Sequence, residues 1–190
     1  MKRPQRGFTL IEIIFVVFII GMALSVISLS VGNAAASMVR KEAEQFMLQG
    51  SYISEQSVLK GETHGLFVEL RPAQDINGSE QWCYQWRRIR DRQWQDVPEL
   101  SQHCLPEEVA IEFVVEDELW EFDPELEYQD PVMGFFPSGD GSGKIEVAIF
   151  PTQSSVGGGE SETERFELDL TGELHWVSEE KRVEEERRGR

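Results

Sequence analysis

The chain has 190 residues, with 18 Lys and Arg against 35 Asp and Glu, and its formal net charge at pH 7 is −17. This balance argues against a nucleic-acid partner, because phosphate binding depends on clustered Lys and Arg, and it disfavours adhesion to anionic lipid. The length supports one globular domain beyond the apolar N-terminal segment, with an acidic surface that favours basic partners.

The N-terminal segment combines an uncharged apolar run with one acidic residue. The run extends from Ile13 to Val31, about long enough to cross a bilayer as a helix, which takes roughly 20 apolar residues. Glu12 lies just inside its start, where a carboxylate costs on the order of 2.5–3.5 kcal/mol if it lies deep. A cationic partner for Glu12 is therefore expected.

Three interpretations of this segment are open. It is a plain signal anchor with Glu12 near the interface, or a cleavable secretory signal ending near Ala34–Ala36. The second would have an apolar core far longer than the usual run of roughly 7–15 residues. The third rests on a basic stretch that ends in Gly7 and is followed by Phe8, Thr, Leu, Ile and Glu12. This sequence resembles the leader and cleavage site of type IV pilins and type II secretion pseudopilins.

That resemblance, which we favour, implies specific processing. A prepilin peptidase is expected to cut between Gly7 and Phe8, and the new N-terminal Phe8 is expected to be N-methylated. Glu12 is expected to meet the N-terminal amine of a neighbouring subunit. The basic leader stays in the cytoplasm, so the chain beyond Val31 lies in the periplasm, anchored in the bacterial inner membrane by a single span.

The apolar pattern continues beyond the span as a stripe at helical spacing, from Met38 to Val58. We predict one helix from about Thr9 to Leu59, stopped by Gly61. At about 1.5 Å per residue it is roughly 75 Å long, more than one small domain can bury. Its first half must therefore be covered by lipid or neighbouring subunits, while its second half packs under the domain.

The residue pattern from residue 61 onward is typical of a β domain. Alternating or β-branched segments predict strands at 65–70, 81–89, 109–115 and 144–150, with a closing hairpin at 165–170 and 173–177. Turn-forming residues mark loops at Asn77–Gly78 and at 151–164.

Three further segments are harder to interpret. Residues 120–128 are expected to form a short strand or edge, interrupted by Pro124. Residues 178–190 have mixed charge and are expected to be frayed or disordered. A basic cluster is interpreted as a hairpin edge paired with local carboxylates, with a docking patch for an acidic partner as the alternative; it comprises Arg87, Arg88, Arg90 and Arg92.

Cys83 and Cys104 are the two cysteines, and both lie in the exported part of the chain. A disulfide between them would close a loop of about 20 residues and contribute roughly 3 kcal/mol; two buried thiols are the alternative. His64, His103 and His175 share no local motif, and the glycine-rich turn after Ser138 lacks the residues of a P-loop or an EF-hand. We therefore expect no enzymatic activity, no cofactor and no metal site.

A turn motif between two late strands narrows the family. Phe136-Pro137-Ser138-Gly139 resembles the turn of the H-type minor pseudopilins (GspH) of the type II secretion system, whose superfamily includes FimT/FimU-like minor pilins. The resemblance implies a pilin-like α+β fold: a long N-terminal helix, half transmembrane and half packed on the domain, followed by an antiparallel β-sandwich.

The expected domains follow from this resemblance: a prepilin leader (1–7), a transmembrane and assembly helix (8–31), its amphipathic continuation (32–60), a periplasmic β-rich domain (61–177) and a charged flexible tail (178–190). The implied function is that of a minor pseudopilin in the tip or initiation complex of the periplasmic pseudopilus, which drives export of folded proteins across the outer membrane. Its partners would be other pseudopilins, the prepilin peptidase and the secretion machinery. The alternatives are a minor pilin of a type IV pilus and a membrane-anchored periplasmic binding module.

Overall fold

The structure is a computed structural model, and it describes residues 10–73, 80–126, 128–152 and 162–189. The side chains of residue 10 and of residues 23–34 lie outside this description. The expected leader, the Asn77–Gly78 turn and most of the loop at 151–164 also fall outside the described residues.

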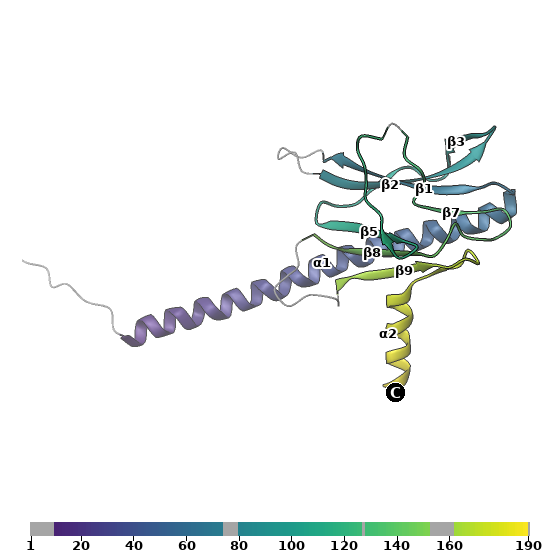
Figure 1. Cartoon of the computed structure of the whole chain (residues 1–190). Coiled ribbons are helices and arrows are strands. Elements are labelled where there is room, and N and C mark those ends of the chain that lie inside the picture. The colour runs from purple at the N-terminus through teal and green to yellow at the C-terminus, as the bar shows by residue number, and fades with distance from the viewer. Residues whose placement is uncertain (1–9, 74–79, 127, 153–161, 190) are drawn as a thin grey trace, which may run out of the picture.

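Helix α1 spans Leu10–Lys60 and ends within one residue of the position that the glycine stop predicts. Gly61 has a φ of +64°, the left-handed conformation that lets the chain leave a helix at little steric cost. The purple N-terminal half of α1 extends away from the domain, and the C-terminal half lies along it (Figure 1). This division is the one that the length of the helix predicts.

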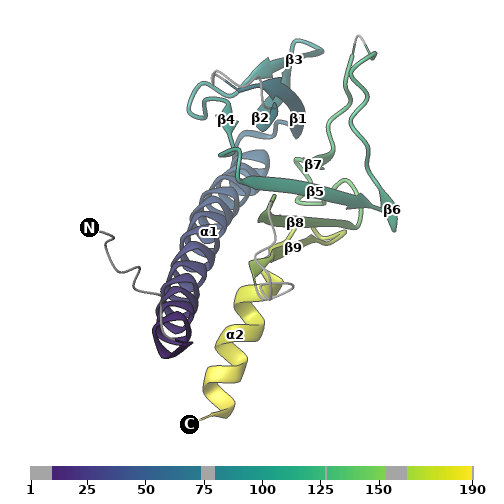
Figure 2. The same ribbon diagram turned by 90° about the vertical axis from the view of Figure 1, so that its left-hand side faces the viewer.

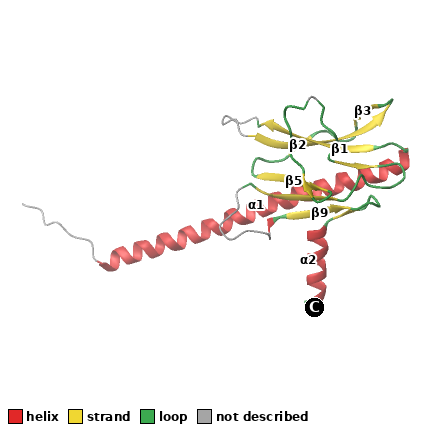
Figure 3. Ribbon diagram, in the orientation of Figure 1, coloured by secondary structure: helices red, strands yellow, loops and turns green. Residues whose placement is uncertain are grey.

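Within the described residues the strands form two antiparallel sheets, shown in yellow in Figure 3. The first sheet contains β1 (His64–Pro72), β2 (Glu80–Arg90), β3 (Gln93–Asp96), β4 (His103–Cys104) and β7 (Met133–Phe135). Its order is β3-β2-β1-β7, and β4 pairs with β2 beside β3. The long β1–β2 ladder runs from His64 opposite Arg88 to Pro72 opposite Glu80.

The second sheet contains β5 (Val109–Val115), β6 (Glu118–Leu119), β8 (Ile145–Pro151), β9 (Glu164–Leu168) and β10 (Leu174–His175). Its order is β10-β9-β8-β5-β6. Figure 2 shows the two sheets one above the other, with α1 passing along one side of both. The α+β class with antiparallel sheets, predicted from the sequence, is confirmed.

Phe46 of α1 joins the helix to both sheets. Its side chain is fully buried, and its ring centroid lies 5.7 Å from that of Tyr84 on β2 and 5.2 Å from that of Phe166 on β9. Val39, Ala43 and Ile53 are buried on the same helix. The spacing of these residues is that of one helical face, so the stripe read from the sequence is the face that contacts the domain.

Two expectations differ from the structure. Beyond β6, residues 120–126 form no strand, because Asp123 accepts hydrogen bonds from the Glu125 amide at 2.9 Å and, through its carbonyl, from the Leu126 amide. The expected disordered tail instead contains helix α2 (Val177–Arg188). Acidic residues in its first turn and basic residues in its last turn suit the helix dipole, so the mixed charge that predicts disorder is ordered along a helix.

We predict that Phe46→Ala lowers the free energy of unfolding by about 3–5 kcal/mol, because it removes the ring shared by both sheets and leaves a cavity. The measurement is guanidinium unfolding in non-ionic detergent, followed by near-ultraviolet circular dichroism. Leu48→Ala is the matched control, since Leu48 lies on the same helix and is 73% exposed. Equal effects of the two substitutions would contradict this packing.

Candidate assembly surface

Residues 11–22 of α1 carry an apolar surface whose one charged residue is Glu12. Between residues 11 and 22, ten large apolar side chains are each 49–70% exposed, and the domain covers none of them. Because consecutive residues point in directions about 100° apart on a helix, these side chains face every side of α1. A contiguous exposed apolar surface of this size marks a site of interaction.

Glu12 lies in the first turn of α1 and is exposed in the single chain. The structure therefore places a carboxylate at the start of the apolar surface, as the sequence predicts. Gly7 and Phe8 lie outside the described residues. No helix in the described ranges meets the combined length and hydropathy of a membrane span.

The other half of α1 is attached to the domain by buried polar contacts as well as by apolar packing. The Nε2 atom of His103 lies 2.6 Å from the Glu42 carboxylate, and its Nδ1 atom lies 2.9 Å from the side-chain amide of Gln45. This pattern fits an imidazole that donates from Nε2 and accepts at Nδ1. Glu42 is only 5% exposed, so His103 supplies the partner that a buried carboxylate requires.

A second polar contact lies at the C-terminal end of α1. The Ser57 hydroxyl donates to the Ile53 carbonyl and lies 2.9 Å from His64 Nδ1 at the start of β1. Burial lowers the pKa of His64 below its ordinary value. The histidine therefore acts as a structural link between α1 and the first sheet.

The disulfide predicted from the sequence is confirmed. Cys83 and Cys104 are bonded, and they face each other in the register of β2 and β4. His103 is the next residue and pairs with Tyr84 in the same ladder. The disulfide thus holds in place the short strand that presents His103 to α1.

Arg40 connects α1 to helix α2. Its guanidinium lies 2.6 Å from the Glu179 carboxylate and 3.8 Å from that of Glu164, and it stacks 4.5 Å from the centroid of the Trp176 ring. Hydrogen bonding to Arg40 lowers the pKa of Glu179. Arg182 adds a contact of 2.8 Å to Glu164. Among the described residues of α2 none is buried, so these charged groups hold its first turns.

The family turn motif supports the end of α1. The Phe136 carbonyl accepts the Gly139 amide at 3.0 Å, and Gly139 has a φ of +93°. A Cβ added at Gly172 would overlap the Gly139 carbonyl, so the two turns are in direct contact. A Cβ at Gly139 would lie 3.9 Å from Val58 of α1. Pro137 and the Ser138 side chain lie at the exposed side of this turn.

The basic cluster is paired locally, as the sequence interpretation favoured. Arg87 lies 3.1 Å from Asp96 on the neighbouring strand β3. Arg88 and Arg90 lie 3.3 Å and 3.2 Å from the two carboxylate oxygens of Glu62. These contacts account for three of the four arginines without an acidic partner protein.

A cluster that sequence reasoning missed lies beside the last hairpin. Asp169, Glu173 and His175 place one ligand atom each within 4.8 Å of one another. The Asp169 carboxylate already accepts bonds from the Glu173 amide and the Thr171 hydroxyl, at 2.9 and 2.8 Å, and these bonds lower its pKa. The cluster therefore closes the turn, and spacing alone gives no signal for it because it depends on the hairpin register.

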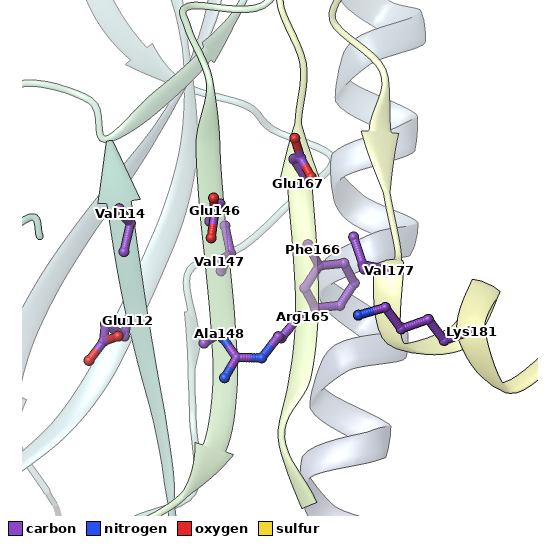
Figure 4. A pocket seen from close by; sticks show the side chains of 10 residues that line it. All are labelled: Glu112, Val114, Glu146, Val147, Ala148, Arg165, Phe166, Glu167, Val177 and Lys181. Atoms are coloured by element: carbon purple, nitrogen blue, oxygen red, sulfur yellow. The ribbon is translucent and has the colours of Figure 1, made fainter. Parts of the chain in front are cut away.

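The outer face of the second sheet has a shallow pocket of about 220 Å³. Figure 4 shows Arg165 extending across β8 beside Ala148, with Lys181 of α2 at the other side. Glu112, Glu146 and Glu167 complete a mixed-charge lining. The described lining residues include no histidine, cysteine or hydroxyl side chain.

Comparisons with known proteins agree with these features. A family model described as the prokaryotic N-terminal methylation motif matches residues 2–28. Type II secretion system protein H of Aeromonas hydrophila is 28% identical over 123 residues, which cover 63% of this chain. The chain spans 62% of the length of that relative.

The fold is similar to that of a solved pseudopilin. The crystal structure of the minor pseudopilin EpsH from the type II secretion system of Vibrio cholerae aligns with a TM-score of 0.53 and 16% identity, covering 73% of this chain and 92% of that one. A second EpsH structure gives a TM-score of 0.48, with 20% identity over 72% of this chain and 94% of the other. The resemblance to H-type pseudopilins that the sequence indicates is confirmed by the matched motif and the relative, and the fold is similar to that of the solved EpsH structure.

We predict that the double variant Cys83→Ser/Cys104→Ser unfolds with a free energy about 3 kcal/mol lower than the native chain, because the closed loop no longer restricts the unfolded state. Urea unfolding with and without reductant measures the difference. Reductant should lower the stability of the native chain and leave the double variant unchanged. If reductant left the unfolding free energy of the native chain unchanged, although it reduces the disulfide of the unfolded chain, the proposed contribution of the disulfide would be contradicted.

Proposed function

We propose that this chain is a minor pseudopilin of the type II secretion system, placed in the tip or initiation complex of the periplasmic pseudopilus. Support comes from the N-terminal methylation motif, from the similarity to a type II secretion protein H and from the EpsH-like fold. The proposed role is assembly-driven export of folded proteins across the outer membrane, with no catalytic step of its own.

The observation that carries the proposal is the unequal covering of α1. Between Val39 and Ser57 one face of α1 is buried against the domain, whereas the large apolar side chains between residues 11 and 22 are all exposed. A helix of 51 residues is about 75 Å long, so one domain of this size covers only part of it. Lipid and then neighbouring helices would cover the remainder, as expected for a subunit that leaves the membrane to join a helical assembly.

Glu12 would supply the specific contact of this assembly. Cleavage between Gly7 and Phe8 would create a new amine at Phe8, and the Glu12 carboxylate of one subunit would pair with the amine of its neighbour. Each charge alone is unfavourable among apolar helices, and the pair relieves both costs. The contact would therefore favour one register between neighbouring helices.

The proposed topology places the leader in the cytoplasm, the helix in the inner membrane and the β domain in the periplasm. The Cys83–Cys104 disulfide fits this arrangement, because disulfides form and persist in the oxidising periplasm. The proposed partners are the prepilin peptidase, which would cut the leader, and other pseudopilins and secretion components, which would contact the helix and the domain.

We predict that Glu12→Gln leaves membrane insertion intact and lowers incorporation into sheared pseudopili by at least about tenfold, the effect of losing about 1.4 kcal/mol. Secretion of a folded exoprotein should fall in parallel, in a strain that has the type II apparatus and no type IV pili. Glu55→Gln is the matched control, an exposed carboxylate on the same helix. Normal incorporation of Glu12→Gln would remove the proposed role of this residue.

Substitution of the residue before the cut should block processing. We predict that Gly7→Val retains residues 1–7 in a host with prepilin peptidase, whereas the native chain begins at N-methylated Phe8; intact-protein mass spectrometry distinguishes the two. Gly21→Ala is the control, because an added Cβ there meets no atom within 4 Å. A native chain that still begins at Met1, or that begins beyond Ala36, would refute the leader assignment.

A further inference from the structure

An aromatic cleft lies where the two sheets separate. It has a volume of about 650 Å³. One wall comes from the ends of β1 and β2, including Leu70 and Trp82, and the other from β5, including Ile111 and Phe113. Leu119 at the end of β6 and residues 120–122 and 124, which follow it, complete the lining.

The aromatic residues of the cleft contact one another in a chain. Ring centroids are 5.9 Å apart for Phe113 and Trp120, 6.4 Å for Trp120 and Phe122, and 6.2 Å for Phe122 and Trp82. Phe113 is 1% exposed and belongs to the core, whereas the other three are half-buried. The Trp120 amide donates to the Phe113 carbonyl at 2.9 Å, so the start of the 119–124 segment is held to β5.

This arrangement leaves apolar surface in contact with solvent. Leu119, which lines the cleft, and Leu126, just beyond it in the chain, are each 55% exposed. Half-buried tryptophans at the centre of such a surface are typical anchors of protein interfaces, where a partner side chain fills the remaining space. The cleft is thus suited to accept a large apolar side chain.

The rim of the cleft is acidic. Glu80, Glu112 and Glu121 line it and are all exposed, and Glu112 also lines the mixed-charge pocket on the outer face of the second sheet. Among the described residues of the lining none is Lys or Arg. A segment entering the cleft would therefore meet carboxylates beside tryptophan faces, and both attract Lys and Arg.

We propose that the aromatic cleft binds a basic segment of a partner protein, with an aromatic or long aliphatic side chain inserted between Trp82 and Trp120. Flanking Lys or Arg side chains contact the carboxylates of Glu80, Glu112 and Glu121. The proposal is separate from assembly through Glu12, since it concerns residues of the two sheets and needs no leader removal.

Charge decides between this partner and a second copy of the chain. The formal net charge of −17 means that two copies would bring acidic surfaces together at the cleft. Like charges placed opposite each other oppose association, and a basic segment removes this repulsion. The same argument disfavours an anionic lipid surface.

The test uses the full chain in non-ionic detergent and two fluorescein-labelled synthetic dodecapeptides, one with Trp and Leu alternating with Lys, the other with each Lys replaced by Glu. Fluorescence anisotropy should show saturable binding of the Lys peptide alone, weakening as salt rises because exposed charge pairs are screened. Glu112→Lys/Glu121→Lys should weaken binding at least about tenfold. Trp120→Ala should weaken it as well, with near-ultraviolet circular dichroism reporting the fold.

The matched control is Glu55→Lys/Glu185→Lys, which makes the same charge change at exposed positions on α1 and α2. Retained binding in this control supports the cleft. Equal weakening by the two double variants, or binding of the Glu peptide as tightly as the Lys peptide, would overturn the proposal. Concentration-dependent dimerisation that Glu112→Lys/Glu121→Lys alters would overturn it in favour of a second copy. If Glu112→Lys/Glu121→Lys loses peptide binding but is still incorporated normally into pseudopili, the cleft binds its partner independently of the proposed assembly through Glu12.

Discussion

The mismatch between the length of α1 and the size of the domain dominates this structure. About 20 residues of the helix, from Val39 to Ser57, are sufficient to contact both sheets. Residues 11–22 have the same helical backbone and, apart from Glu12, an apolar surface that the described part of the domain does not cover. Burial of apolar surface is the main favourable term in association, so this part of the helix is a source of binding free energy that folding alone leaves unused.

The domain holds the covered half of α1 through contacts of different kinds. Phe46 packs against aromatic rings of both sheets, and Glu42 pairs with His103 from a strand attached by the disulfide. Arg40 ties the same helix to Glu179 of α2. A different orientation of α1 would leave one partner of each buried polar contact unpaired. These contacts therefore favour one angle between the helix and the domain, and they also stabilise it.

Local patterns were sufficient for much of the fold and for the processing motif. The helical stripe located the buried face of α1, and two cysteines in the β-rich part of the chain indicated a disulfide that the structure contains. The pairing of Glu42 with His103 was not predictable, because 61 residues separate them. The segment beyond β6 was read as a strand from its aromatic residues, but Trp120 and Phe122 line a cleft between the sheets. Such placement depends on tertiary packing, which periodicity does not encode.

The unbroken course of α1, from Leu10 to Lys60, has a mechanical consequence. Since the helix is attached firmly at its C-terminal half, an imposed turn of the N-terminal half is transmitted to the sheets. Moving a helix by one residue along its own screw corresponds to about 1.5 Å of rise and roughly 100° of rotation. In an assembly in which the N-terminal half of α1 packs against a neighbouring helix, a one-residue slip would therefore turn the aromatic cleft about the helix axis, so the direction in which the cleft faces depends on the register of that packing.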